Sequence, residues 1–366
     1  MIPFVNLGAQ YAAYQEEIDS AIASVLRRGN PIGGKSVEAF ENALAEDTKV
    51  RFALSCASGT SALCLALGAL GLCRGDEVVI PDYTFVATAD AVVLSGGVPR
   101  FADVGEDFLV SPDAVEERIS ERTVGIIAVD LFGQCANYKE LERIAKRRGL
   151  WILEDAAQSI GAFQDGKAAG SFGTVAATSF YPTKPFGAYG DGGALLTDDE
   201  RIFRRAKEFA RHGKDSRGFY SSLGTNSRLD AIQAAILLVK RRHLKEELAR
   251  RERNGKIYDA LFSSMPSFQI PKIRPKNTSV RAQYAVRCKN RDAVVKKLSL
   301  CGVPTRIYYE RPLSAEPFFA RFPETKKDAE ENFRARVLSG ETFCLPICAF
   351  TDAEEVASKI RTALSP

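Results

Sequence analysis

Two strand ends in this sequence carry residue types that could act together on one small molecule. The apolar run GLWILEDA (149–156) ends in Glu154 and Asp155. A second run, TVAATSFYP (174–182), is followed by Lys184 and then by the glycine-rich segment FGAYGDGG. An amine can bind an aldehyde covalently, and a carboxylate can stabilise the protonated nitrogen of an aromatic ring. Together the two residue types indicate chemistry on pyridoxal phosphate, an aldehyde-bearing pyridine.

Each residue has a simpler explanation when it is taken alone. An aspartate after a strand usually caps the next turn, and a single lysine is usually a solvated surface residue. The joint interpretation requires that Asp155 and Lys184 follow strands that end at the same edge of one sheet. Parallel strands meet this requirement, and ligands of such folds bind at the carboxyl ends of the strands.

A phosphate-binding segment is also expected, in ASGTSA (57–62). Backbone N–H groups at the start of a helix bind phosphate, and nearby hydroxyls add hydrogen bonds. Gly59 would allow close approach, Thr60 and Ser61 would open the helix, and Ser179 would add a hydroxyl. In the next motif, PDYTFVATA, Phe85 could stack on the pyridine ring, although core packing is the preferred explanation when it is taken alone.

Short apolar runs alternate with helical patterns over the first two thirds of the chain. We expect strands over residues 51–56, 77–81, 98–104, 123–133, 149–156 and 174–182. We expect helices over residues 60–72, 88–97 and 139–149. Alternation at this spacing predicts an α/β fold with a large, mostly parallel sheet wrapped by helices.

A long helical stretch from Leu229 to about Leu261 precedes a proline-containing segment and suggests a domain boundary. We expect a large cofactor-binding domain over residues 1–245 and a small C-terminal α/β domain over residues 246–366. Within the small domain we expect strands over 282–289 and 303–309, and helices over 291–301 and 352–364.

The segment GNPIGGKS (29–36) matches the P-loop pattern for nucleotide phosphates. A P-loop needs a buried strand before it and a helix after it. The preceding residues, 16–29, instead predict an amphipathic helix with one apolar face made of Ile18, Ile22, Val25 and Leu26. NTP hydrolysis through residues 29–36 is therefore kept only as the alternative from a different class.

Composition argues against several other functions. The 50 basic and 46 acidic residues give a net charge of +4 and are interspersed, which predicts no nucleic-acid partner. Eight cysteines without a C-x-x-C pair and two histidines predict no metal site. The sequence has no apolar stretch of about 18 residues and no secretory pattern, so we expect no membrane span and a cytoplasmic location.

Taken together, these motifs resemble the DegT/DnrJ/EryC1/StrS family of sugar aminotransferases. The similarity runs through NPIGGKSVEAFE, GTSAL, DEVVIPDYTFVATA, ILEDAAQSIGA, TSFYPTKPFGAYGDGGA, GTNSRLDAIQAAIL and CGVPTRIYY. The resemblance implies the fold-type I architecture of aspartate aminotransferase. It also implies pyridoxal phosphate as cofactor, with pyridoxamine phosphate as its second form.

The resemblance assigns roles to single residues of this chain. Lys184 is the Schiff-base lysine and proton carrier, and Asp155 pairs with the pyridine nitrogen. Gln158 lies near the phenolic oxygen of the ring, and Phe85 stacks on the ring. The phosphate is held by Gly59, Thr60 and Ser179.

Asn226 occupies the asparagine position of a loop that, in this family, reaches the neighbouring subunit's phosphate. The resemblance therefore implies a homodimer with two shared active sites, although a place near the start of the long helix would also explain this asparagine. It further implies an amino-acid donor, by family habit glutamate, and a nucleotide-linked keto-sugar acceptor.

The runs RHGKD, AQYAVR and GVPTRIYYERPL look closest to members that aminate C3 of a UDP-linked 2-acetamido-3-keto-hexuronic acid. Arg228 is the candidate partner of the sugar carboxylate, because guanidinium binds carboxylates bidentately; an interface ion pair explains it equally. We expect Tyr308 and Tyr309 at the substrate. The subgroup has histidine where this chain has Tyr308, which donates a hydrogen bond but carries no positive charge. Another dTDP- or UDP-linked 3- or 4-keto-sugar stays open.

Overall fold

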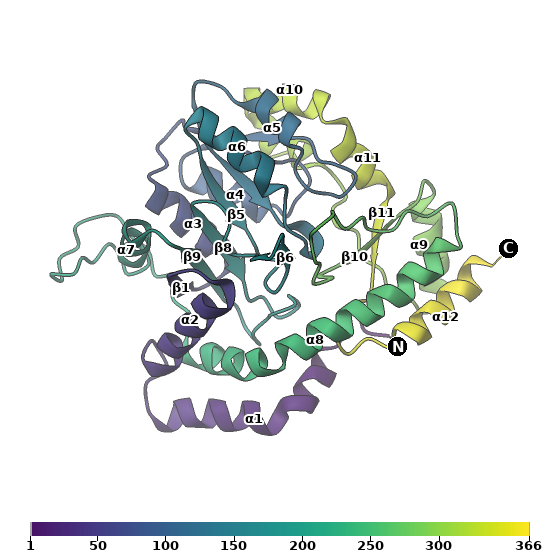
Figure 1. Ribbon diagram of the computed structural model, residues 1–366, viewed down its shortest axis with the longest axis horizontal. Helices are drawn as coiled ribbons and strands as arrows, with labels where there is room; N and C mark the ends of the chain where they lie inside the picture. The colour runs from purple at the N-terminus through teal and green to yellow at the C-terminus, as the bar shows by residue number, and fades with distance from the viewer. Residues whose placement is uncertain (1, 366) are drawn as a thin grey trace.

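A seven-stranded sheet forms the centre of the computed structural model, which describes residues 2–365 (Figure 1). Its strands lie in the order β1-β9-β8-β5-β4-β2-β3. Their bounds are β1 Phe52–Cys56, β2 Glu77–Pro81, β3 Val98–Ala102, β4 Thr123–Val129, β5 Trp151–Asp155, β8 Val175–Ser179 and β9 Gly193–Thr197. Strands β3, β2, β4, β5 and β8 are parallel, and β9 is antiparallel to both β8 and β1. The predicted mostly parallel sheet is confirmed.

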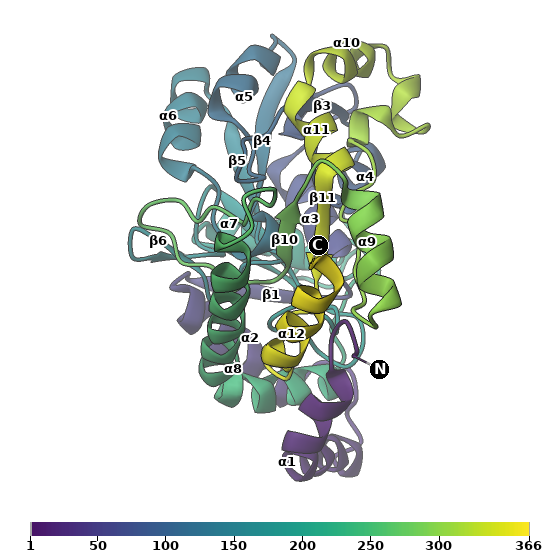
Figure 2. The same ribbon diagram turned by 90° about the vertical axis from the view of Figure 1, so that its right-hand side faces the viewer.

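Helices cover both faces of this sheet (Figures 1 and 2). Alternate residues of β4 face different core clusters: Ile127 and Val129 pack on one side, and Ile126 and Ala128 on the other. This period of two is expected for a strand buried on both faces. The helices are α1 Leu7–Arg27, α2 Lys35–Thr48, α3 Gly59–Leu70, α4 Ala87–Leu94, α5 Pro112–Arg118, α6 Tyr138–Arg148, α7 Glu200–Phe209 and α8 Ala231–Ser263.

Most of the predicted elements in this part of the chain are confirmed. The helix predicted over 139–149 is α6, and it ends where Gly149 adopts a left-handed conformation, as glycine does without strain. The strand predicted over 123–133 is shorter, because it stops at Val129 and a 3₁₀ turn follows over Leu131–Gly133. Strand β9 was not predicted from the sequence.

The C-terminal part of the chain contains a second, two-stranded antiparallel sheet of β10 (Tyr284–Arg287) and β11 (Thr342–Leu345) (Figure 2). Its core cluster joins these strands to the C-terminal half of α8, and helices α9 and α12 pack on each other beside it. The remaining helices are α9 Arg291–Leu300, α10 Pro323–Glu331, α11 Phe333–Glu341 and α12 Ala353–Leu364. The expected helices over 291–301 and 352–364 are confirmed, as is a strand within 282–289.

The strand predicted over residues 303–309 is wrong. The segment forms only one isolated bridge, between Arg306 and Cys344. Pro304 has no N–H to offer a ladder. The backbone N–H of Tyr309 is used elsewhere, because it donates to the Tyr83 hydroxyl at 3.0 Å. These residues therefore line a cavity instead of extending the small sheet.

The expected domain boundary stays a prediction. A division into residues 1–245 and 246–366 falls inside the single continuous helix α8. Helix α10 also returns to the large sheet, where the Asp328 carboxylate accepts a hydrogen bond from the backbone N–H of Phe101 at 2.9 Å.

The segment 29–36 follows helix α1, and its last two residues begin helix α2. The strand that a P-loop requires is missing from residues 2–48, where an isolated bridge of Ile32 with Asp230 is the one β contact. Ile18 and Val25 are buried as expected, but Leu26 is exposed, so the expected apolar face is narrower. Within residues 2–365, no helix is both long and apolar enough to cross a membrane.

Candidate active site

A cavity of about 450 Å³ opens at the carboxyl edge of the large sheet, a size typical of small-molecule sites. The start of α3 and the ends of β5 and β8 contribute to its wall, together with the segment that contains Tyr308 and Tyr309. It brings together most of the residues singled out in the sequence, namely Gly59, Thr60, Phe85, Asp155, Gln158, Ser179, Lys184, Tyr308 and Tyr309.

Asp155 is the last residue of β5, and its carboxylate is buried beside the cavity. It accepts hydrogen bonds from the Thr88 hydroxyl at 3.0 Å and from the Ala157 backbone N–H at 3.2 Å. Burial raises the pKa of this carboxyl, whereas the hydrogen bonds and the positive charge of Lys184 lower it. A cation in the cavity would further favour the ionised carboxylate.

Lys184 follows β8 in a tight turn, in which its backbone N–H donates to the Tyr181 carbonyl at 2.9 Å. Burial lowers the pKa of its ammonium group, and the charge of Asp155 opposes that shift. Over residues 2–365, the side chain of Lys184 donates no hydrogen bond that would occupy the amine. The cavity thus contains an available amine whose proton is held less tightly than that of a solvated lysine.

Gly59 allows α3 to begin directly on the end of β8. A Cβ atom at this position would lie 2.8 Å from the Cβ of Ser179, closer than carbon atoms pack. Ser58 caps the helix, since its hydroxyl accepts a hydrogen bond from the Ser61 N–H at 3.1 Å. The first turn of α3 and Ser179 therefore face the same space, which suits an anion such as phosphate. Ser61 does not line the cavity, and its role as a ligand stays a prediction.

Aromatic side chains form the opposite wall. Phe85 is 54% exposed, so it is not a core residue, and its ring centre lies 6.2 Å from that of Tyr309. Tyr83 fixes this wall by donating its hydroxyl to the Tyr308 carbonyl and accepting from the Tyr309 N–H. Gln158 is held by the Phe132 N–H, which donates to its side-chain oxygen at 2.8 Å.

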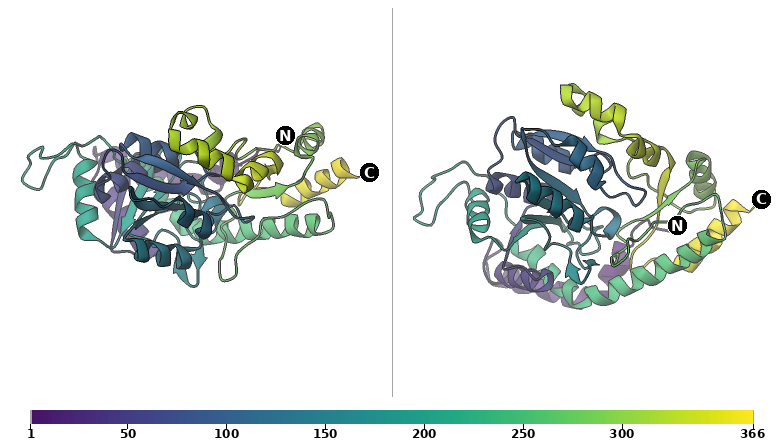
Figure 3. Two further views of the ribbon diagram at one scale, coloured as in Figure 1. Left: turned by 90° about the horizontal axis from the view of Figure 1, so that it is seen from above. Right: turned by 45° about the horizontal axis from the view of Figure 1, so that its top comes forward.

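Asn226 and Arg228 do not belong to this cavity within one chain. Both are exposed, and the Arg228 guanidinium donates to the Asn226 side-chain oxygen at 2.9 Å. They lie at the base of the loop between α7 and α8, where Asn226 pairs with Arg211. The rest of this loop projects away from the body of the molecule (Figures 1 and 3). The helix cap is Asp230, which accepts from the Gln233 N–H, so capping does not explain Asn226.

Several cavity residues were not singled out in the sequence. The polar ones are Ser58, Thr84, Thr178, Tyr181, Thr183, Asp191 and Gln283. Thr88 and Tyr83 also act on the site, through Asp155 and the Tyr308 segment. Both lie in the motif PDYTFVATA, where the type of residue gave no signal because buried threonine and tyrosine are common in cores.

Tyr189 anchors the C-terminal part of the loop that carries Lys184 to neighbouring helices. The Tyr189 N–H donates to Gln233 at 3.0 Å, and its hydroxyl donates to Gln10 at 3.3 Å. The ammonium of Lys240 lies 4.5 Å from the centre of the Tyr189 ring. Two helices, α1 and α8, thus hold the loop in place.

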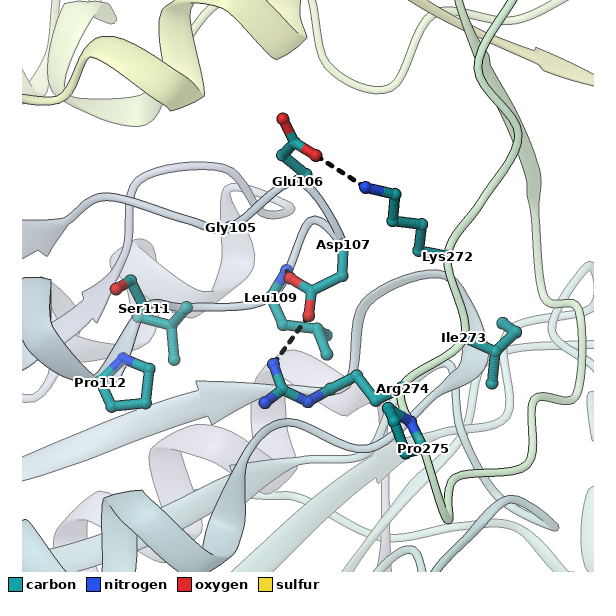
Figure 4. A pocket seen from close by; sticks show the side chains of 11 residues that line it. Gly105, Glu106, Asp107, Leu109, Ser111, Pro112, Lys272, Ile273, Arg274 and Pro275 are labelled. Carbon is teal, nitrogen blue, oxygen red and sulfur yellow. Dashed lines mark hydrogen bonds and ion pairs between the residues drawn. The ribbon is translucent and has the colours of Figure 1, made fainter.

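A second groove, of about 380 Å³, lies on another part of the molecule (Figure 4). Its charged residues pair with one another: Lys272 with Glu106 at 2.9 Å, and Arg274 with Asp107 at 2.8 Å. Such pairs leave no charge available for a ligand. Residues 2–365 also contain no group of three or more side chains that could hold a metal ion.

Comparison with known proteins places this geometry among aminotransferases. The model of the DegT/DnrJ/EryC1/StrS aminotransferase family matches residues 12–363. The UDP-2-acetamido-2-deoxy-3-oxo-D-glucuronate aminotransferase of Pseudomonas aeruginosa is 42% identical over 87% of this chain and 89% of its own length.

Two crystal structures are also similar. One is S. venezuelae DesV in complex with a ketimine intermediate, with 34% identity, a TM-score of 0.95, and coverage of 100% of this chain and 99% of that chain. The other is Bacillus subtilis ntda with bound cofactor PMP, with 29% identity, a TM-score of 0.87, and coverage of 96% of this chain and 82% of that chain.

The contact between Gly59 and Ser179 gives a testable prediction. In Gly59→Ala, the added methyl group would push α3 away from β8, so the Kd for pyridoxal phosphate should rise by about tenfold, roughly 1.4 kcal/mol. Equilibrium titration of the purified protein measures this. The double variant with Ser179→Gly removes the obstructing atom and should bind no worse than Ser179→Gly alone. Unchanged binding by Gly59→Ala would contradict the close approach.

The buried Lys240 gives a second prediction. Its ammonium has no hydrogen-bond partner within residues 2–365, and burial lowers its pKa from 10.5 to about 8. Below pH 8, Lys240 is charged in the folded and the unfolded protein, and its burial lowers the free energy of unfolding by the full amount. This destabilisation disappears as pH rises to 10.5, because Lys240 loses its proton first in the folded protein. Lys240→Met should raise the free energy of unfolding at pH 7 by up to about 3 kcal/mol.

This gain should shrink steadily between pH 8 and 10.5. Denaturant unfolding at several pH values measures it, with Lys245→Met, an exposed lysine of the same helix, as the control. A gain that is independent of pH, or equal in the control, would contradict the claim that the buried charge of Lys240 destabilises the folded protein.

Proposed function

Since this chain belongs to the DegT/DnrJ/EryC1/StrS aminotransferase family, and several of its relatives are nucleotide-sugar aminotransferases, we propose that it binds pyridoxal phosphate beside Lys184 and aminates a nucleotide-linked keto-sugar. One observation carries this proposal: the available amine of Lys184 and the buried carboxylate of Asp155 line the same cavity. In the second groove, by contrast, the Lys272 amine is paired with Glu106 at 2.9 Å.

The residues present fit this cofactor. The first turn of α3 and Ser179 would hold the phosphate, and Phe85 would lie against the ring. Asp155 would keep a proton on the ring nitrogen, because its carboxylate is buried beside the cavity and a cation there lowers the pKa that burial raises. When bound, the cofactor supplies an aldehyde and an electron-withdrawing ring.

Lys184 would have two tasks. Its amine would hold the cofactor's aldehyde carbon, and afterwards its Nζ would move a proton between the substrate carbon and the cofactor carbon. Both tasks require the neutral amine, and burial favours that form by lowering the pKa. The turn at Tyr181 and the contacts of Tyr189 would keep Nζ in place between the two carbons.

We propose glutamate as the amino donor and C3 of a UDP-linked 2-acetamido-3-keto-hexuronic acid as the acceptor. The P. aeruginosa relative, whose name specifies a UDP-2-acetamido-2-deoxy-3-oxo-D-glucuronate, supports this choice. Tyr308 and Tyr309 would contact the sugar from the cavity wall, and Arg228 would bind its carboxylate from a second subunit. Another dTDP- or UDP-linked 3- or 4-keto-sugar is the alternative acceptor.

We also propose a homodimer with shared active sites. The loop between α7 and α8 exposes Phe219, Tyr220 and Leu223, which are 65%, 72% and 86% accessible. Exposed apolar residues grouped on a projecting loop are typical of an interaction surface. In a dimer this loop would carry Asn226 toward the partner's phosphate site. The expected cytoplasmic location stays a prediction.

The first experiment tests the reaction. Purified wild-type protein with pyridoxal phosphate should show a visible absorption band, and added glutamate should move it into the near ultraviolet. Lys184→Ala should lack the band of the protein-bound aldehyde. A wild-type protein without any band would contradict the proposal.

The second experiment tests the shared sites. Lys184→Ala and Asn226→Ala homodimers should each be impaired at low pyridoxal phosphate concentration. Mixed dimers contain one site with both wild-type residues, so mixing the two proteins under exchange conditions should restore activity. If the mixture is no more active than its parts, Asn226 does not act across subunits.

A further inference from the structure

The acceptor of the proposed reaction carries several negative charges, which must be balanced at the cavity. A nucleoside diphosphate has two phosphates, and a uronic acid adds a carboxylate. The charged residues lining the cavity are Asp155, Asp191 and Lys184. Asp191 would repel the acceptor, Asp155 would be paired with the protonated ring nitrogen, and the amine of Lys184 is committed to the reaction centre. The wall that a single chain contributes therefore offers no cation for the acceptor's anionic groups, and the proposed Arg228 of a second subunit would serve the carboxylate alone.

One arginine next to this wall has no acidic partner. Arg306 is exposed, and within residues 2–365 no carboxylate lies within 4.0 Å of its guanidinium. Its one hydrogen bond goes to the carbonyl of the preceding residue, Thr305, at 3.3 Å. By contrast, Arg311, on the same segment, pairs with Glu316 at 3.8 Å.

The position of Arg306 is fixed from two sides. Its backbone pairs with Cys344 in both directions, at 3.1 and 2.7 Å. Its guanidinium lies 5.6 Å from the centre of the Phe4 ring, and that ring packs edge-on against Tyr308 at 6.4 Å. A guanidinium held over an aromatic ring keeps its donors free for a ligand.

Arg306 is also electrostatically close to the cavity. Burial raises the pKa of Tyr308, and the positive charge of Arg306 lowers it. Tyr308 lines the cavity, so the field of Arg306 reaches the space that the acceptor would occupy. In this chain Tyr308 itself cannot supply positive charge.

We propose that Arg306 determines acceptor specificity by binding an anionic group of the sugar nucleotide, a phosphate or a carboxylate, at the mouth of the cavity. The inference rests on the proposed function and adds a residue of the same chain to the acceptor site. In this arrangement Tyr308 is a neutral hydrogen-bond donor, and the neighbouring Arg306 is a cationic donor.

The test is calorimetric binding to the holoenzyme in its pyridoxamine form, with UDP-N-acetylglucosamine and with its C6 carboxylate analogue. Arg306→Gln removes the charge, Arg306→Lys keeps it, and Arg311→Gln is the matched control. We expect Arg306→Gln to raise the Kd by about tenfold, and Arg306→Lys by less. A rise for both nucleotides assigns Arg306 to the diphosphate, and a rise for the carboxylate analogue alone assigns it to the carboxylate.

The inference is overturned if Arg306→Gln changes neither Kd more than Arg311→Gln does, or if wild-type protein binds neither nucleotide. The glutamate-driven absorption shift of the wild type is recorded on the same samples. If that shift is present and the Arg306 result is negative, only this inference fails. If the shift is absent, the proposed function itself fails.

Discussion

The site depends on the interaction between two opposite charges in one cavity, those of the buried Asp155 and the partly buried Lys184. Burial raises the pKa of Asp155 and lowers the pKa of Lys184, so it favours the neutral form of each group. The charge of the other group opposes each shift. The parallel pairing of β5 with β8, in which Asp155 lies opposite Ala177, makes this proximity possible. Because both strands end at the same edge, a carboxylate and an amine 29 positions apart in the sequence face the same small molecule.

The rest of the structure supports this arrangement from a distance. Gly59 lets the start of α3 approach the end of β8, so an anion site lies beside the amine. The long helix α8 spans from the Lys184 loop to the small sheet and contacts that loop through Gln233 and Lys240. Tyr83 fixes the cavity wall that the C-terminal half of the chain contributes. Parts of the chain far apart in sequence thus meet around one cavity.

The sequence allowed much of the fold and cavity to be predicted, because the signals were local. Apolar runs that end in Asp155 and near Lys184 revealed both strands and their chemistry, and α6 ended at Gly149 as its pattern indicated. The prediction was wrong at residues 303–309, which have the pattern of a strand. There the Tyr309 N–H donates to the hydroxyl of Tyr83, a residue distant in sequence, and the segment lines the cavity. Thr88 and Tyr83 were missed for the same reason, since their roles depend on tertiary contacts that no local pattern encodes.

Asn226 and Arg228 show a different limit. Their motif was recognisable, but one chain alone leaves them exposed at the base of the loop between α7 and α8. Their proposed tasks depend on a second copy, and neither periodicity nor composition specifies how two copies meet. The family resemblance supplied that expectation, and the apolar tip of the loop supports it.

The most direct test of the account is to identify the lysine that binds the cofactor. Protein incubated with pyridoxal phosphate is reduced with borohydride, digested, and analysed by mass spectrometry. We predict that the label lies on the peptide containing Lys184. Lys240, whose pKa burial also lowers, serves as an internal comparison. Label mainly on Lys240, label scattered over surface lysines, or no label would contradict the claim that Lys184 and Asp155 form the catalytic centre.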